Sequence, residues 1–222
     1  MSDSYILQVK AHFTPFRNTN NAPTMAKYMR NLFPFLGIKS PERKALFRSF
    51  IAANGLPQKS ELEEVVKGLF ALSEREFHYI AIDLLGKFAK KLEIEDLDLL
   101  EFMIVNKSWW DSVDTTAKWV GVFFKKYPDL TKITTGRWIT SDNIWLQRMS
   151  IIFQLAYKKN TDVELLFDYS LRKADSKEFF IQKAIGWALR QYAKIDAQRV
   201  KTFVDAHELA PLSRREALKH FS

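Results

Sequence analysis

The sequence predicts an all-α protein whose helices form a repeating array. Glycine and proline number only seven each in the 222 residues. Between them, apolar residues recur every three or four positions over long stretches, which is the spacing that gives a helix one apolar face. Because apolar residues make up 47% of the chain, a sizeable core can be buried, and we expect a single domain over residues 1–222.

Serine and glutamate residues three positions apart mark several expected helix starts, because such a pair can form a capping box. Ser40 followed by Pro41 fits an N-cap with proline at the first helical position. The segment Trp119–Phe124 would fit a strand if taken alone, since it is rich in aromatic and β-branched residues. The three capping-box pairs are Ser60 with Glu63, Ser73 with Glu76, and Ser213 with Glu216.

A repeat along the chain favours helix for that segment as well. An aromatic residue followed by one or two lysines recurs four times, and the last lysines, Lys91, Lys126, Lys159 and Lys194, are 35, 33 and 35 residues apart. Each recurrence ends a long helical pattern, and a shorter one lies between each pair. The predicted long helices are Glu76–Lys90, Trp109–Lys125, Ile144–Lys158 and Phe179–Tyr192.

This period favours HEAT-like repeats, in which pairs of helices stack, although their usual period is about 40 to 47 residues. The tetratricopeptide period is similar, but its tryptophan-containing motif is absent. The predicted fold is therefore an all-α, right-handed superhelical solenoid of HEAT-like repeats with a concave basic groove. We expect an N-terminal helical cap over 1–50, helical pairs over 60–210 and a terminal helix over 211–222.

Charge and composition limit the partners and cofactors. The chain has 34 Lys and Arg against 26 Asp and Glu, a formal net charge of +8, which favours a polyanionic partner if the charge is clustered. Cysteine is absent, and no histidine pair has metal-ligand spacing, so we expect no metal cofactor. The four histidines are His12, His78, His207 and His220.

The start of the chain lacks the pattern of a signal peptide, and no uncharged apolar run of about 18 residues exists, so we expect a cytoplasmic protein. The lysines at the helix ends are explained by the helix dipole. A basic amphipathic protein can also bind membrane surfaces, but these apolar helix faces suit packing against one another.

The segment Lys107–Asp114 combines two tryptophans with two aspartates at the start of a predicted long helix. Trp110 and Asp114 are four residues apart, so an indole and a carboxylate share one helix face. Composition alone favours a structural interpretation, with both tryptophans in the core and the aspartates near the positive end of the helix dipole.

Two further long helices carry basic residues at equivalent repeat positions, Arg148 and Lys183. In a solenoid such positions line one wall, so these residues and Trp187 can share a groove with Asp114. A basic groove with interleaved aromatic residues is typical of nucleic-acid binding. The alternative is that both cations extend to solvent while Trp187 lies in the core.

These segments together resemble the bacterial DNA alkylation repair enzymes, the AlkD-like glycosylases built from HEAT-like repeats. The resemblance covers essentially the whole chain, and the Trp-Trp-Asp-x-Val-Asp element is its most specific part. The segments that carry it are Phe33–Arg43, Glu76–Asp83, Lys107–Asp114, Asn143–Arg148 and Gln182–Arg190.

The resemblance implies a DNA glycosylase that releases cationic alkylated purines, such as 3-methyladenine and 7-methylguanine, from duplex DNA without a base-flipping pocket and without a cofactor. It implies that Asp114 is the catalytic carboxylate and that Trp110 and Trp187 pack on the deoxyribose of the lesion. It further implies that Arg148 holds the phosphate beside the lesion and that Arg190 does so nearby.

Further DNA-binding residues are expected besides Arg190. Lys183 follows from its repeat position, the resemblance adds Tyr28 and Lys39, and Arg43 is expected to bind DNA as well. We expect a monomer, the default for a solenoid that wraps DNA, and expect it to act on DNA in the nucleoid. Asp111 is a second carboxylate near Trp110, and the family match prefers Asp114 over it. The alternative function is a non-catalytic HEAT-like module that binds DNA structures or a protein partner.

Overall fold

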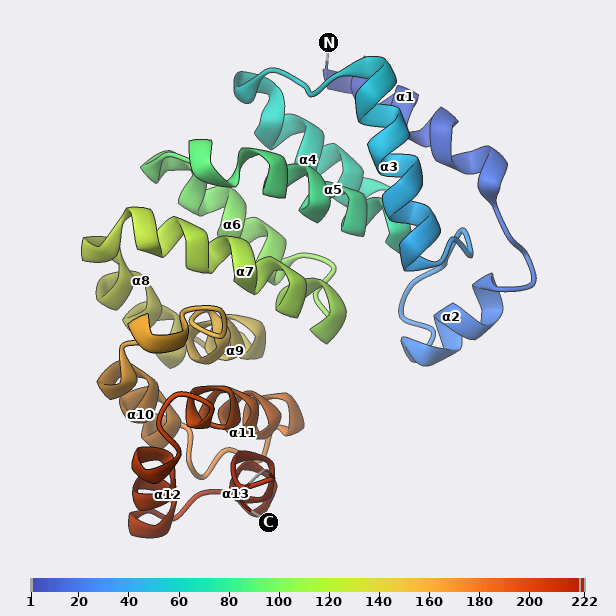
Figure 1. The fold of residues 1–222 in the computed structure, drawn as a ribbon. Coiled ribbons are helices and arrows are strands. Elements are labelled where there is room, and N and C mark those ends of the chain that lie inside the picture. The colour runs from blue at the N-terminus through green and yellow to red at the C-terminus, as the bar shows by residue number, and fades with distance from the viewer. Residues whose placement is uncertain (1, 220, 222) are drawn as a thin grey trace. The chain divides into compact units, whose positions relative to one another are not determined.

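The computed structural model describes residues 2–219 and 221, so His220 and the ends of the predicted cap and terminal helix lie outside the described residues. Within the described chain there are thirteen α-helices, five short 3-10 helices and no strand (Figure 1). The all-α prediction is confirmed, and Trp119–Phe124 lies inside helix α7. The contacts divide the chain into two compact units, Met1–Lys91 and Leu92–Ser222.

The first unit contains five α-helices. Helix α1 packs against α3 and α4, and α4 packs along α5. Their shared core includes Phe13 and Phe50, which are at most 1% exposed. The elements are α1 (Ser2–Phe13), η1 (Thr14–Phe16), α2 (Ala22–Tyr28), α3 (Ser40–Asn54), η2 (Lys59–Glu61), α4 (Leu62–Ala71), α5 (Arg75–Phe88) and η3 (Ala89–Lys91).

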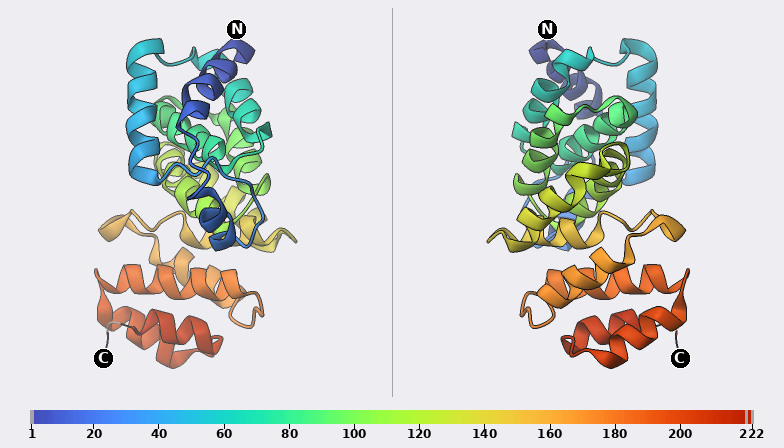
Figure 2. Two further views of the ribbon diagram at one scale, coloured as in Figure 1. Left: turned by 90° about the vertical axis from the view of Figure 1, so that its right-hand side faces the viewer. Right: turned by 90° about the vertical axis from the view of Figure 1, so that its left-hand side faces the viewer.

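The second unit contains the other eight α-helices. Helix α9 contacts α6, α7, α8 and α11, and α11 is covered by α12 and α13 (Figures 1 and 2). The elements are η4 (Ile94–Asp96), α6 (Leu97–Val105), α7 (Trp110–Lys126), α8 (Pro128–Thr140), α9 (Ile144–Ile152), η5 (Lys158–Asn160), α10 (Val163–Arg172), α11 (Phe179–Ala193), α12 (Ala197–Ala206) and α13 (Pro211–Ala217).

Three of the four predicted long helices match α5, α7 and α11 to within two residues at each end. The fourth, Ile144–Lys158, is wrong, because α9 ends at Ile152. The Gln154 side chain exchanges two hydrogen bonds with the backbone of Asp162, at 2.7 and 3.2 Å. The Tyr157 hydroxyl donates to the carbonyl of Gly121 at 2.7 Å. These contacts hold the chain in a turn where the periodicity alone predicted a continuous helix.

The expected capping boxes are also wrong, although helices begin near all three. Leu62, Arg75 and Pro211 are the first residues of α4, α5 and α13, and none of the preceding residues caps its helix through a side chain. A capping box does form one turn earlier, between Gln58 and Glu61 at the start of η2. Helix α3 begins at Ser40, with Lys39 in the capping position.

Candidate active site

Helices α7, α9 and α11 of the second unit border a pocket of about 260 Å³. It contains every residue predicted to act at the reaction centre, together with two of the predicted DNA-binding cations. The lining residues are Trp110, Asp114, Arg148, Phe179, Phe180, Lys183, Trp187 and Arg190. Residues from three helices, far apart in the sequence, therefore meet in one hollow.

Asp114 and Arg148 form a two-pronged ion pair in this pocket. Nε of Arg148 donates to Oδ1 of Asp114 and Nη2 donates to Oδ2, each at 2.8 Å. Nη1 of Arg148 donates to the carbonyl of Phe180 at the start of α11. Because the planar guanidinium matches both carboxylate oxygens, the carboxylate is fixed in orientation. The Arg148 side chain is 5% exposed and that of Asp114 is 18% exposed, so the carboxylate is the more accessible partner.

Burial raises the pKa of the Asp114 carboxyl above its ordinary value. The hydrogen bonds and positive charge of Arg148 act in the opposite direction, and the charge of Asp111 adds to the increase. Desolvation disfavours the charged form of an acid, whereas a neighbouring cation favours it. Arg148 therefore opposes the protonation of Asp114 that burial favours.

The two adjacent tryptophans of α7 have different surroundings. Trp110 lines the pocket. Trp109 packs edge-on against Trp145 and Phe180, with ring centroids 5.7 and 4.9 Å apart. Trp109 thus packs among aromatic side chains but is not fully buried, while Trp110 and Trp187 both border the pocket. Because Phe180 also lines the pocket, this aromatic packing supports the part of the pocket wall that Phe180 forms.

Asp111, the alternative carboxylate, is not among the residues that line the pocket. It is 8% exposed and lies in the first turn of α7, where a negative charge is favourable beside the unpaired N–H groups. Its charge nevertheless raises the pKa of Asp114. Of the two aspartates, only Asp114 therefore lines the pocket.

Lys183 and Arg190 lie on α11 and share one carboxylate, that of Glu216 on α13. Arg190 Nη1 contacts Oε2 of Glu216 at 2.6 Å, and Lys183 Nζ contacts Oε1 at 3.1 Å. The hydrogen bond from Arg190, with Lys183, holds the pKa of Glu216 below its ordinary value, so the carboxylate remains charged. Sequence reasoning missed Glu216 because the spacing from Ser213 predicted a helix cap.

Sequence reasoning also missed Phe179 and Phe180, which begin the wall that α11 contributes to the pocket. Phe179 is 56% exposed, an uncommon position for a large apolar side chain beside charged groups. Phe180 packs on Trp109 and Trp145. The signal in the sequence was the aromatic pair one turn before Lys183.

The other three predicted DNA-binding residues belong to the first unit. Tyr28 ends α2 and is 71% exposed, whereas Arg43 is 8% exposed. The guanidinium of Arg43 lies 4.5 Å from the centre of the Tyr79 ring, and its Nη2 is 3.6 Å from a carboxylate oxygen of Asp83. Lys39 is exposed at the start of α3. Arg43 is therefore engaged by Tyr79 and Asp83 inside the unit.

The loop that leads to Lys39 is held by the first turn of α5. The Glu76 carboxylate, fully buried, accepts hydrogen bonds from the backbone N–H groups of Leu36, Gly37 and Ile38 at 2.9 to 3.0 Å. Gly37 has a φ of +93°, which favours glycine. The backbone before Lys39 is therefore fixed.

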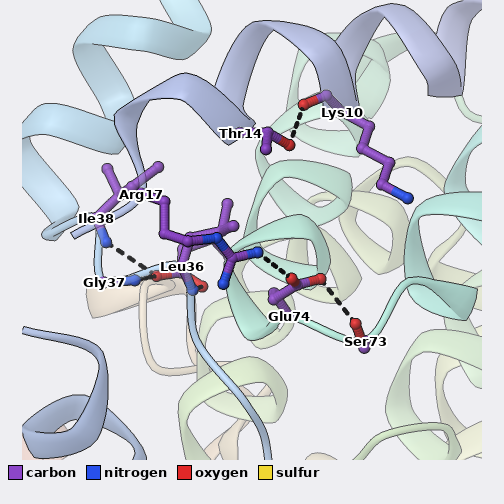
Figure 3. Close-up of polar contacts among 9 residues, drawn as sticks. Lys10, Thr14, Arg17, Leu36, Gly37, Ile38, Ser73 and Glu74 are labelled. Carbon is purple, nitrogen blue, oxygen red and sulfur yellow. Dashed lines mark hydrogen bonds and ion pairs between the residues drawn. The ribbon is translucent and has the colours of Figure 1, made fainter. Parts of the chain in front are cut away.

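A second contact that restrains this region is the ion pair between Arg17 and Glu74, which lies beside the loop in Figure 3. The two side chains form an ion pair at 2.6 Å, and the N–H of Arg75 donates to the carbonyl of Pro34 at 2.9 Å. The first residue of α5 and the residue before it thus contact the two segments that flank α2 in the sequence.

No group of three or more acidic or histidine residues among the described residues is arranged to hold a metal ion. No described helix has the length and apolar character needed to cross a membrane.

Comparison with known proteins agrees with the all-α fold. Residues 9–221 match the family model described as DNA alkylation repair enzyme. A solved structure described as a predicted DNA alkylation repair enzyme from Enterococcus faecalis has a TM-score of 0.87 and 32% sequence identity, and the match covers 93% of this chain and 97% of that one. No curated protein matches the chain. The chain belongs to the DNA alkylation repair enzyme family.

Proposed function

We propose that this family member is a DNA glycosylase that hydrolyses the N-glycosidic bond of cationic alkylated purines in duplex DNA. The observation that carries the proposal is the Asp114 carboxylate, held by Arg148 with 2.8 Å hydrogen bonds to both oxygens and bordered by Trp110 and Trp187. The proposed partner is duplex DNA that contains 3-methyladenine or 7-methylguanine, bound by a monomer in the cytoplasm, where the DNA forms the nucleoid.

The chemistry suits a single carboxylate, because a purine that already carries a positive charge is a good leaving group. When the C1′–N bond breaks, its electron pair goes to the purine, which leaves neutral, and the sugar gains oxocarbenium character. Asp114 stabilises this positive charge and orients a water molecule. The water oxygen bonds to C1′, and its proton passes to solvent.

The indoles of Trp110 and Trp187 supply the second part of the proposed mechanism. Their electron-rich faces stabilise a cationic sugar by cation–π interaction, in addition to packing against it. Arg148 orients Asp114 and favours its ionised form by lowering the pKa that burial raises. A contact between Arg148 and DNA phosphate stays a prediction, since in the free protein three of its nitrogens donate to Asp114 and Phe180.

The test is the release of 7-methylguanine and 3-methyladenine from methylated duplex DNA by the parent protein and by Asp114→Asn. We expect the single-turnover rate to fall about 10²-fold or more, with DNA affinity retained. Asp168→Asn is the matched control, because Asp168 also pairs with an arginine, Arg172, but lies half exposed on α10. A folded parent protein that binds DNA but releases neither base would instead support the non-catalytic binding module.

A further inference from the structure

The C-terminal helix α13 brings a carboxylate to the pocket from a position outside the three pocket helices. Glu216 is half-buried, with a side chain that is 13% exposed, and its two oxygens contact Lys183 and Arg190. Nη1 of Arg190 also donates to the backbone carbonyl of Glu216 at 3.2 Å. One residue of α13 thus restrains two cations of the pocket wall.

The close approach of the two helices is built around Gly186. A Cβ atom at this position would lie 2.4 Å from the Cβ of Glu216 and 2.9 Å from the carbonyl oxygen of Ser213, so any larger residue would push α13 away. The Ser213 hydroxyl donates to the carbonyl of Gln182 at 3.1 Å. The absence of a side chain at Gly186 therefore allows α13 to approach α11 closely enough for Glu216 to contact Lys183 and Arg190.

Helical spacing explains why one carboxylate can serve both cations. Lys183, Gly186 and Arg190 follow one another at intervals of three and four residues, so they lie on one face of α11. The two long side chains come from successive turns above and below the glycine and converge on Glu216. Without the carboxylate, two like charges on one helix face would repel each other and sample many rotamers.

The arrangement still leaves positive charge and donors for a ligand. One carboxylate between two cations leaves a net charge of +1, and in the described chain Arg190 uses only Nη1 for Glu216. The Nε and Nη2 groups of Arg190 and the remaining ammonium protons of Lys183 are held in place by the contacts with Glu216 but do not donate to it. A phosphodiester is the acceptor that such a pair fits.

We propose that Glu216 is a positioning residue that fixes Lys183 and Arg190 as a phosphate-binding pair, and through them sets the sugar of the lesion against Asp114. The inference rests on the proposed glycosylase function. If Glu216 positions the two cations, its removal should lower the excision rate within the complex and change DNA affinity little. The opposite pattern is expected if Glu216 is only a negative charge near DNA. A simple charge only repels DNA, so its removal tightens binding and leaves the rate within the complex unchanged.

The test compares the parent protein with Glu216→Gln, measuring the DNA dissociation constant and the single-turnover excision rate at saturating protein. We expect the rate to fall about tenfold or more because a small displacement of the sugar weakens catalysis, while the dissociation constant changes less than threefold. Glu164→Gln is the matched control, since Glu164 pairs with Arg199 on the exposed surface of the same unit. Tighter binding with an unchanged rate would overturn the proposal.

Two further variants keep the test decisive. In a Lys183→Gln, Arg190→Gln background, Glu216→Gln should cause no additional loss of rate, and a further tenfold loss there would overturn the proposal. If Glu216→Gln fails to fold, Glu216→Asp retains the charge but is too short to reach both cations, and it should show the same loss; a parental rate would overturn the proposal. Excision by the parent protein in the same assay tests the glycosylase function separately.

Discussion

Glu76 in the first unit is a buried carboxylate and Asp114 in the second is a half-buried one, and their oxygens have different partners. Glu76 is fully buried and accepts three backbone N–H groups from one loop. Asp114 accepts from one guanidinium, and its side chain remains 18% exposed at a pocket. A carboxylate whose lone pairs all face the backbone holds a loop in place, whereas one that is fixed on one side and open on the other can meet a substrate.

The largest effect that separates the two is expected from Glu76→Gln. A side-chain amide presents N–H groups where the loop needs an acceptor, so buried backbone donors lose their partners at about 1 to 3 kcal/mol each. We expect the free energy of unfolding to fall by about 3 kcal/mol in urea titrations. Glu63→Gln is the matched control, because Glu63 forms an exposed pair with Lys67; an equal effect in both variants would contradict this role.

The misassigned glutamates show where local patterns stop being informative. Glu76 and Glu216 both stand three residues after a serine, so both fit a capping box, yet one holds a loop about 40 residues earlier and the other contacts α11. Helix capping is decided within one turn, and a sequence pattern cannot detect a stronger donor that arrives from a distant segment. The helix starts could be predicted, but the partners of these carboxylates could not.

The candidate site was predictable in a similar way. Helical spacing placed Trp110 and Asp114 on one face, and repeat positions indicated Arg148, Lys183 and Trp187, all of which line the pocket. The direct pairing of Asp114 with Arg148 was not predictable, because it depends on how α7 and α9 pack. The right-handed superhelical arrangement of HEAT-like repeats stays a prediction.

A medium effect is expected in the pH dependence of excision. Because burial raises the pKa of Asp114, and because the ionised form is the one that stabilises the sugar, activity should be lost as the pH falls through a value above the ordinary aspartate range. Arg148 lowers this pKa, so Arg148→Met should move the acid limb to higher pH, and Arg148→Lys should move it less.

The measurement is the single-turnover rate across pH, corrected for base loss from the same DNA without protein. Stability changes in the opposite sense to activity, since a raised folded-state pKa means that ionisation of Asp114 weakens the fold as the pH rises. An acid limb in Arg148→Met at or below the parental position would show that the ion pair does not control the ionisation of Asp114.

The smallest expected effect concerns Arg43, which resembles Arg148 in being a buried arginine near an aspartate. Its closest approach to Asp83 is 3.6 Å, and it lies over the Tyr79 ring, whereas Arg148 makes two 2.8 Å hydrogen bonds. We expect Arg43→Met to lower the free energy of unfolding by about 1 kcal/mol, mainly through the lost cation–π contact, and to leave the salt dependence of DNA binding unchanged.

Lys39→Met provides the contrast, because Lys39 is exposed at the start of α3 and its side chain can reach a phosphate directly. Removing one phosphate contact should reduce the slope of log affinity against log salt by about 1. A reduced slope in Arg43→Met as well would mean that the arginine leaves Tyr79 to bind DNA. Burial in the free protein would then not predict which cations of the first unit contact the DNA backbone.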